Sequence, residues 1–253
     1  MNILVLSHMF PKNELDNNGI FVYEQCRHLS KIGCNIKVIS PIPFVPPLFN
    51  YFKEKWRRYI NAPRKHTFGK VQAIYPRYIR PPGSFFFPFS PFFMFISVFL
   101  VLRRIKSTWK IDIIHAHAVM PDGLVAYLLS KLLKIPIVCT LHGGDINVYP
   151  FYNKLSYIFT KISLNKISHI VAVSNNLAQR ALTIIAKEKT IHVLRNGADK
   201  NKFYLKDKYK CREKLNIPYE SKIVMFIGNL NRDKGAHLLP QILDKILDRK
   251  SVV

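Results

Sequence analysis

Acidic side chains are scarce in this chain of 253 residues. It carries 15 Asp and Glu residues against 39 Lys and Arg residues, which gives a formal net charge of +24 at pH 7. Such an excess favours anionic partners: nucleic acid, phosphorylated ligands or an acidic membrane surface. The basic residues are spread along the chain, with one denser group at residues 53–66. That group is interpreted either as a solvated loop or as a contact for lipid or phosphate.

Cysteine is also rare, and the four residues Cys26, Cys34, Cys139 and Cys211 form no CxxC pair. A zinc site or a disulfide framework is therefore not expected, and reduced thiols in the cytosol fit this pattern. The first residues, MNILVLSHMF, have no basic leader and no small-residue cleavage site. We interpret them as a first β-strand and not as a signal peptide.

Glycine occurs 10 times, in none of the motifs that mark common nucleotide-binding or hydrolase sites. The GxGxxG turn of dinucleotide oxidoreductases should follow the first strand, where this chain has a long loop with Pro11 and Gly19. A Walker A loop and a GxSxG nucleophile elbow are absent as well. The two histidines of HAH, residues 115–117, lack a carboxylate at metal-ligand spacing. We therefore expect neither a metal nor a cofactor.

One stretch, SFFFPFSPFFMFISVFLVL at residues 84–102, is uncharged over nearly the length of a membrane span. Pro88 and Pro91 interrupt it and leave only about a dozen residues for a continuous helix. The pattern favours a helix that is buried in the core or rests on a membrane surface. A transmembrane span is the least favoured interpretation.

Short apolar runs alternate with helical stretches, which is typical of a parallel sheet flanked by helices. The expected fold class is therefore α/β, with a Rossmann-like parallel sheet and helices on both faces. Strands are expected at residues 2–7, 35–40, 70–79 (an edge strand), 111–117, 135–145, 169–174 and 190–199. Helices are expected at residues 20–33, 121–134 and 175–186.

A second domain of the same kind is predicted to begin near the end of the sequence. The stretch IVMFIGNLNRDKGAHLLPQILDKIL, residues 223–247, has the pattern of a buried strand, a turn and an amphipathic helix beginning near Lys234. We place the first domain at residues 1–200, and the linker with the start of the second at 201–253. One strand and one helix cannot cover both faces of a new sheet, so we expect a truncated chain with little or no activity.

Polar residues gather in the loops that follow the predicted strands. In open parallel sheets, ligands bind outside the carboxyl ends of the strands. Each residue has a structural interpretation, because a histidine at a strand end is often a hydrogen-bonded core residue and Asn-Gly often makes a turn. Their convergence on one edge of the sheet favours a binding site, formed by His115, His117, His142, Gly143, Gly144, Asp145, Ser174, Asn175, Asn176, Asn196, Gly197 and Asp199.

The ordered series FPKNELDNNGIFVYEQCRHLSKIG, DIIHAHAVMPDG, TLHGGD, VAVSNNL, VLRNGAD and FIGNLNRDKG resembles a known family. It is similar to the family 4 (group 1) retaining glycosyltransferases of GT-B fold, from residue 1 to about residue 247. The resemblance implies transfer of a sugar from a nucleotide-sugar to an acceptor hydroxyl, without a metal. It also implies an N-terminal acceptor domain and a C-terminal nucleotide domain. Surface polysaccharide or glycolipid assembly is the expected role, on lipid-linked saccharides at the cytoplasmic side of a membrane, with peripheral membrane contact.

The resemblance also implies roles for residues of the first domain. Gly19 would let the backbone approach the donor phosphate, and His142 would lie beside the reacting sugar as a hydrogen-bonding group. Asp145 would shape the acceptor pocket or orient His142. The other residues expected in that pocket are His117 and Asn196.

FIGNLNRDKG matches the family's phosphate-binding turn, in which an arginine and a lysine stabilise the leaving diphosphate. Lys234 and Gly235 are kept, whereas Asn229 stands where arginine is commonest. Arg232 is the candidate to replace that missing cation.

A non-catalytic protein that binds anions or nucleic acid is the alternative, based on the net charge and the many aromatic residues. Against it, the basic residues form no clear stripe and no nucleic-acid motif is recognisable.

Overall fold

The computed structural model describes residues 1–46, 54–81, 83–186, 188–228 and 230–248. The chain divides into two units, Met1–Gly197 and Ala198–Val253.

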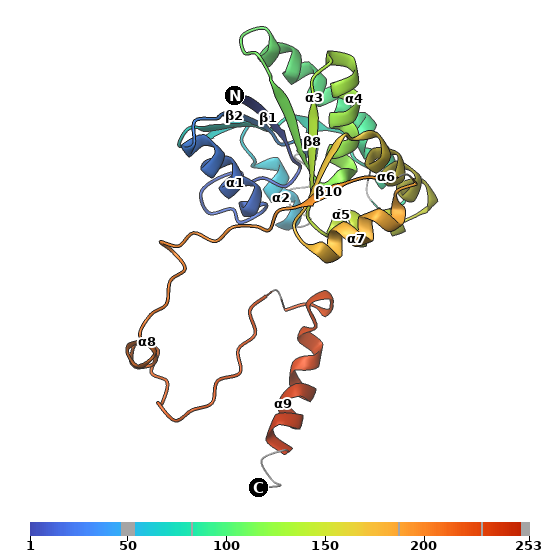
Figure 1. Cartoon of the computed structure of the whole chain (residues 1–253). Coiled ribbons are helices and arrows are strands. Elements are labelled where there is room, and N and C mark those ends of the chain that lie inside the picture. Colours follow the sequence, from blue (N-terminus) through green and yellow to red (C-terminus); the bar gives the residue numbers. More distant parts are fainter. Residues whose placement is uncertain (47–53, 82, 187, 229, 249–253) are drawn as a thin grey trace. The chain divides into compact units, whose positions relative to one another are not determined.

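An eight-stranded sheet forms the centre of the first unit, with the strand order β10-β9-β8-β7-β1-β2-β5-β4 (Figure 1). All neighbouring strands are parallel except β4, which pairs antiparallel with β5. The short strands β3 (Ile42–Pro43) and β6 (Arg77–Tyr78) form a separate parallel pair. The eight strands are β1 Asn2–Leu6, β2 Asn35–Ile39, β4 Lys65–Phe68, β5 Val71–Ile74, β7 Ile113–His117, β8 Ile137–Leu141, β9 His169–Ala172 and β10 Ile191–Val193.

Helices cover both faces of this sheet, as the alternation of side chains along a strand requires. In β1, Ile3 and Val5 pack into one core with residues of α1, whereas Leu4 and Leu6 pack into a larger core on the other face. The helices are α1 Ile20–Lys31, α2 Glu54–Ile60, α3 Ser90–Lys106, α4 Leu124–Leu133, α5 Gly144–Asn147, α6 Lys154–Lys166 and α7 Asn175–Ile184. The predicted α/β class is confirmed.

The predicted edge strand at residues 70–79 is not at the edge. Its first half is β5, and β4 lies beyond it. Gly69 and Lys70 form the two-residue turn between them, with Gly69 at φ +57°. The second half is the separate strand β6, at Arg77 and Tyr78. The polar sequence KHTF of β4 gave no strand signal, which explains the wrong prediction.

The apolar stretch at residues 84–102 forms a 3-10 turn, Phe87–Phe89, followed by α3. Met94, Val98 and Leu102 are fully buried on one side of α3, whereas Ile96 and Leu100 on the opposite side are 60% and 57% exposed. By length and composition, Phe87–Lys106 is long and apolar enough to cross a membrane. Because one side of α3 packs into the core of the unit, the predicted core helix is confirmed for that side.

The second unit contains α8 (Lys208–Lys214), two 3-10 turns (Arg232–Lys234 and Ala236–Leu238) and α9 (Leu239–Asp248). The predicted strand at residues 222–228 is not formed. Most of its residues are exposed, Met225 to 73% and Ile227 to 84%. A strand needs a neighbour for its backbone hydrogen bonds, and the described residues of this unit provide none. The predicted helix begins at Leu239 instead of near Lys234.

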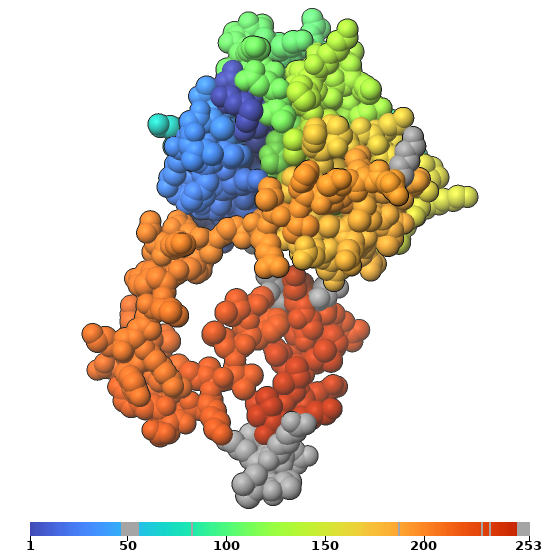
Figure 2. Space-filling model, viewed as in Figure 1, coloured from blue at the N-terminus to red at the C-terminus, as the bar shows by residue number. Residues whose placement is uncertain are grey.

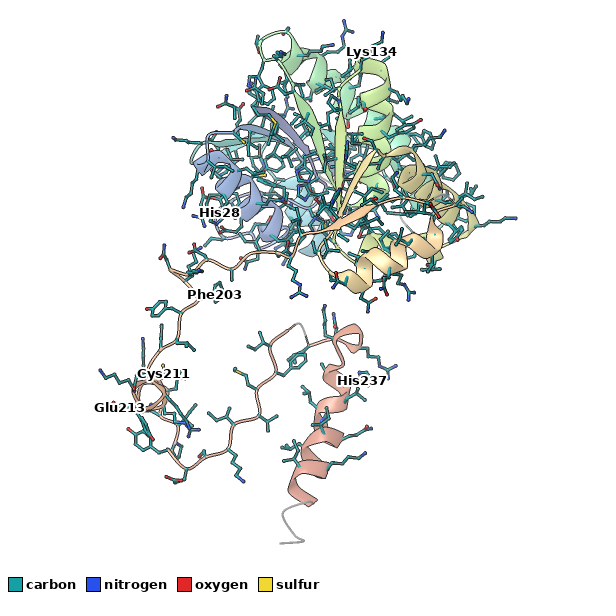
Figure 3. All side chains as sticks on the ribbon, viewed as in Figure 1. His28, Lys134, Phe203, Cys211, Glu213 and His237 are labelled. Atoms are coloured by element: carbon teal, nitrogen blue, oxygen red, sulfur yellow. The ribbon has the colours of Figure 1, made fainter. Side chains whose placement is uncertain are left out.

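Many apolar side chains of the second unit are exposed, among them Leu205 and Leu230 (Figure 2, orange to red). Phe203 of this unit, labelled in Figure 3, is 73% exposed.

Candidate active site

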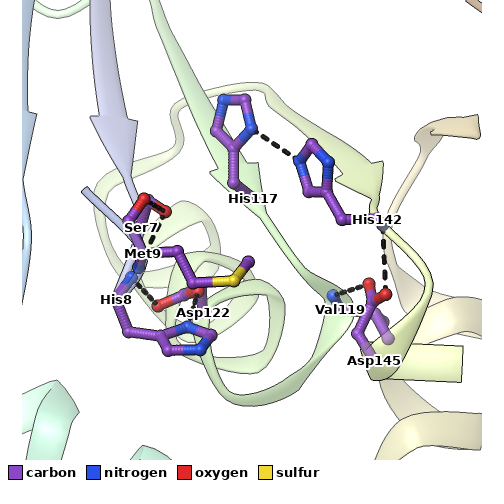
Figure 4. A network of polar contacts seen from close by, with 8 residues as sticks. All are labelled: Ser7, His8, Met9, His117, Val119, Asp122, His142 and Asp145. Carbon is purple, nitrogen blue, oxygen red and sulfur yellow. Dashed lines mark hydrogen bonds and ion pairs between the residues drawn. The ribbon is translucent and has the colours of Figure 1, made fainter. Parts of the chain in front are cut away.

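A buried carboxylate joins the turns that follow β7 and β8 (Figure 4). Asp145, in the first turn of α5, is 2% exposed. Its Oδ1 accepts hydrogen bonds from the backbone N–H groups of His142 (3.1 Å) and Gly143 (2.8 Å), and its Oδ2 accepts one from Val119 (3.0 Å). Burial raises the pKa of this carboxyl above its ordinary value, against the opposing effect of the three N–H groups. Asp145 therefore positions His142 through the backbone and not through its imidazole.

Three histidine rings lie next to one another at the ends of β7 and β8. The ring centroids are 4.3 Å apart for His115 and His117, and 5.2 Å apart for His117 and His142. Burial lowers the pKa of His115 and of His142 to about 4, and that of His117 well below its ordinary value. All three imidazoles are thus neutral at pH 7. Such a His142 is a weak base and is suited to hydrogen bonding.

The proton positions in this group follow from its contacts. His117 Nδ1 lies 2.9 Å from His142 Nε2, so one nitrogen donates and the other accepts. His117 Nε2 is buried and has no partner among the described residues. A buried N–H without an acceptor is rare in proteins, so we assign the proton of His117 to Nδ1. His142 then accepts at Nε2 and carries its own proton on Nδ1.

Gly19 lies at the start of α1, close to His142. It is buried and adopts a left-handed conformation, with φ +71°. A Cβ at this position would lie 2.3 Å from the carbonyl oxygen of Met9, so the loop after β1 packs directly on the helix start. The ring of Phe21, in the first turn of α1, lies 4.5 Å from that of His142 between centroids. The structure therefore brings two predicted site residues into one region, beside a helix N-terminus that suits an anion.

Gly19→Ala should destabilise the protein by about 2 kcal/mol more than Gly33→Ala. Both glycines have positive φ, which costs an alanine about 1 kcal/mol. A Cβ at Gly33 meets nothing within 4 Å, whereas one at Gly19 must displace backbone atoms. Urea unfolding of the two variants measures the difference. Equal losses of unfolding free energy in the two variants would show that the loop after β1 can move away from a Cβ at position 19 and does not fix the start of α1.

A cavity of about 290 Å³ opens at the ends of β1 and β2, where it is lined by His8, Met9 and Pro41. Among its lining residues are His8, Tyr78, Arg80, Phe87 and Ser90. The hydroxyl of Ser90 is buried and has no partner in the part of the chain that the structure describes. Burial raises the pKa of Tyr78 to about 12, so its phenol stays protonated at pH 7. The cavity thus combines aromatic rings, two basic side chains (Lys12 and Arg80) and hydroxyl groups, which suits a polar ligand with apolar faces.

The sequence analysis missed a hydrogen-bonded pair of side chains in this region. The backbone N–H of His8 donates to Asp122 Oδ1 (3.0 Å), and His8 Nδ1 lies 2.5 Å from Asp122 Oδ2. Figure 4 shows the two side chains together. Asp122 is fully buried, whereas His8 lines the cavity. The rule that ligands bind at strand ends pointed to the loop after β1, and it would have found His8 as a candidate. Nothing in the sequence links His8 to Asp122.

The remaining predicted site residues are less central. His117 and Asp145 are buried and contact protein groups, and Asn196 is exposed after β10 and does not line the cavity. Arg232 and Lys234 are exposed in the second unit, where the Lys234 N–H donates to Asn231 Oδ1 at 3.0 Å. Asn229 lies outside the described residues. The roles predicted for these residues stay predictions.

Comparison with known proteins extends the interpretation of this site. A glycosyltransferase of Bacillus subtilis (strain 168), assigned to teichuronic acid biosynthesis, is 29% identical over 255 residues, which cover 100% of this chain and 64% of that protein. N-acetyl-alpha-D-glucosaminyl L-malate synthase of Bacillus anthracis is 27% identical over 58% of this chain and 39% of its own length. The chain thus spans less than two thirds of the length of these curated relatives.

Sucrose-phosphate synthase from Thermosynechococcus elongatus has a similar structure, with a TM-score of 0.68 at 14% identity over 92% of this chain and 56% of that one. A UGT2 of Phytolacca americana, in complex with UDP-2fluoro-glucose and pterostilbene, has a TM-score of 0.52 at 12% identity, over 85% and 57% of the two chains. These likenesses concern the fold. The family model of Glycosyltransferase Family 4 matches residues 19–202, well over half of the sequence and from Gly19 onward. The chain belongs to glycosyltransferase family 4.

Proposed function

We propose that this chain is all or part of a retaining glycosyltransferase, which moves a sugar from a nucleotide-sugar donor to an acceptor hydroxyl. The observation that carries the proposal is the family match over residues that include Gly19, His142 and Asp145. The Bacillus subtilis relative, which aligns with the whole chain, supports a role in surface polysaccharide or glycolipid assembly. The alternative, a non-catalytic anion-binding protein, is not favoured by family membership.

The donor is proposed to place its phosphates at the N-terminal end of α1, where Gly19 lets the loop after β1 pack against the start of the helix. A neutral His142 would then donate a hydrogen bond from Nδ1 to the transferred sugar. Lys234, with Arg232 and Asn229, would stabilise the charge that develops on the leaving diphosphate. No metal takes part in this proposal.

The acceptor is proposed to occupy the cavity at the strand ends. Its aromatic residues, Tyr78 and Phe87 among them, can pack against the apolar faces of sugar rings. The Ser90 hydroxyl, which has no partner among the described residues, and the guanidinium of Arg80 can bind hydroxyl or phosphate groups of a lipid-linked saccharide. His117, Asp145 and Asn196 would support this pocket from the turns around it.

Peripheral contact with the cytoplasmic face of a membrane is part of the proposal. Ile96 and Leu100 on the outer side of α3 are mostly exposed. The ring of Phe92 in α3 contacts that of Phe159 in α6 at 5.6 Å, so the two helices form one continuous surface. Cations at the end of α3 suit anionic headgroups, namely Arg103, Arg104 and Lys106.

A transfer assay tests the proposed function. The assay incubates protein with UDP-sugars and a lipid-linked saccharide, and NMR gives the anomeric configuration of the saccharide that is formed. It is run with the 253-residue chain and with any longer product that the gene's reading frame encodes beyond Val253. We expect the 253 residues alone to transfer little or no sugar, and a longer product to transfer it with retention. In that product, Lys234→Ala and His142→Ala should each lower the rate at least about tenfold.

The matched control is Lys245→Ala, on α9 of the same unit, which should leave the rate unchanged. Inversion at the anomeric carbon would reject the retaining mechanism. Rates near wild type in His142→Ala or Lys234→Ala would remove that residue from the reaction. A longer product that transfers no sugar from any donor would overturn the proposal.

A further inference from the structure

A second cavity in the first unit, of about 540 Å³, lies between the C-terminal half of α3 and strands β2, β4 and β5. Five of its twelve lining residues are cationic: Lys37, Arg64, Lys65, Arg77 and Arg104. It shares no lining residue with the cavity at the strand ends. The name cationic groove is used for it below.

The side of α3 that faces the cationic groove follows a helical period. Val101, Arg104 and Ile105 are spaced at i, i+3 and i+4, which places them along one side of α3, and Thr108 follows in the turn after the helix. The opposite wall is the sheet face at Lys37 of β2, with β4 and β5 beyond it. The groove is therefore held between two packed elements.

The cations of the groove are not neutralised by protein carboxylates. No Asp or Glu lines the groove, and none forms a salt bridge with these five side chains among the residues that the structure describes. Lys37 instead contacts the ring of Trp109, with Nζ 4.9 Å from its centroid. Elsewhere in the same unit cations do find carboxylates, as in the pair of Lys12 and Asp16 at 3.2 Å. Five like charges along one concave surface repel one another unless an anion binds.

Arg77 gives the groove an unsatisfied donor. Its Nη2 donates to the carbonyl oxygen of Ala62, whereas its Nη1 is buried and has no partner in the described part of the chain. A buried guanidinium N–H without an acceptor costs free energy that a bound oxyanion would recover. Burial and the nearby charge of Arg64 both lower the pKa of Arg77, in line with an uncompensated cation.

From this geometry we propose that the cationic groove is a binding site for a phosphate-bearing anion, separate from the site of sugar transfer. Guanidinium groups such as those of Arg64, Arg77 and Arg104 bind phosphate oxygens in pairs, with strong charge-assisted hydrogen bonds. The volume of the groove matches that of small-molecule sites. The phosphate has two possible sources: the headgroup of an anionic lipid, next to the exposed side of α3, or a soluble phosphate ester.

Isothermal titration calorimetry with inorganic pyrophosphate tests the site. The wild-type chain should bind pyrophosphate, and Arg77→Gln and Arg104→Gln should each weaken binding at least about tenfold. Arg104 is exposed, so Arg104→Gln tests the site even if Arg77→Gln perturbs folding. Lys110→Gln is the matched control, because it removes the same charge from an 87% exposed side chain outside the groove.

Flotation with vesicles distinguishes the two sources, using 30% phosphatidylglycerol in phosphatidylcholine against pure phosphatidylcholine. If the anionic vesicles bind wild type and Lys110→Gln but release Arg104→Gln, the ligand is a lipid headgroup. If only pyrophosphate binding is lost in Arg104→Gln, the ligand is a soluble phosphate ester. If Arg77→Gln and Arg104→Gln bind pyrophosphate and vesicles as well as the Lys110→Gln control does, the proposed site does not exist. These readouts do not depend on sugar transfer, so they are independent of the proposed reaction, whereas the vesicle result also bears on the membrane contact proposed above.

Discussion

Asp145→Ala should lower the free energy of unfolding of the first unit by about 4 kcal/mol. The substitution removes the acceptor of three backbone N–H groups, those of Val119, His142 and Gly143. Each N–H left unsatisfied in a buried site costs about 1–3 kcal/mol, and water that enters the space would recover part of that cost. For a unit of this size the change corresponds to a melting temperature lower by roughly 8–16 °C. Differential scanning calorimetry of the chain measures the shift.

Asp145→Asn is the matched control for this prediction. An asparagine oxygen in the place of Oδ1 still accepts from His142 and Gly143, whereas its amide nitrogen faces the N–H of Val119, donor against donor. Its cost should lie between those of wild type and Asp145→Ala, at about 2 kcal/mol. If Asp145→Ala costs less than about 1 kcal/mol, the carboxylate does not hold the two turns together. The positioning of His142 would then need another explanation.

The sheet and its helices could be predicted because their signals are local. The run Ile3 to Leu6 is apolar at every position, as expected of a strand buried on both faces, and α1 ends close to Gly33 as predicted. The polar strand β4 has no such signal, because its place at the edge is fixed by pairing with β5. Conversely, residues 222–228 have the composition of a strand but form none, since composition does not supply a neighbouring strand.

The candidate site could be predicted only in part, for the same reason. The loops after β7 and β8 stood out because each concentrates polar residues within a few positions, such as His142 and Asp145. The pair of His8 and Asp122 joins positions 114 apart in the sequence, and only the fold brings them together. The cationic side chains of the groove likewise come from β2, from β4 and the residue before it, from β6 and from α3, so no single stretch of the sequence predicts the groove.

The stability of the first unit should depend on pH through its buried histidines, and His115 provides the clearest case. Burial lowers its pKa in the folded protein to about 4, from an ordinary value of 6.5 in the unfolded chain. Between these values the unfolded chain takes up a proton that folded His115 does not, so protons favour unfolding. The contribution is fully present above pH 6.5 and is lost as the pH falls toward 4. A shift of this size corresponds to about 3 kcal/mol.

Other groups titrate in the same range, so the prediction concerns the difference in unfolding free energy between wild type and His115→Gln. Burial raises the pKa of Asp122 and of Asp145, and these carboxyls therefore favour the folded state as the pH falls, opposite to His115. His115→Gln removes the imidazole and leaves both carboxyls in place. Relative to this variant, wild type should lose about 3 kcal/mol of unfolding free energy between pH 6.5 and pH 4. Urea unfolding at steps of half a pH unit gives both curves.

Thr140→Val is the control that separates titration from packing. The Thr140 hydroxyl lies 2.8 Å from His115 Nε2, so its removal costs a hydrogen bond but keeps the titrating ring. Thr140→Val should therefore be less stable than wild type at pH 7 and show the same relative loss toward pH 4. If wild type and His115→Gln instead give parallel curves, His115 takes up its proton in the folded state as readily as in the unfolded chain. Because the rings of His115 and His117 are adjacent and His117 is paired with His142, that outcome would also weaken the assignment of a neutral His142 at the candidate active site.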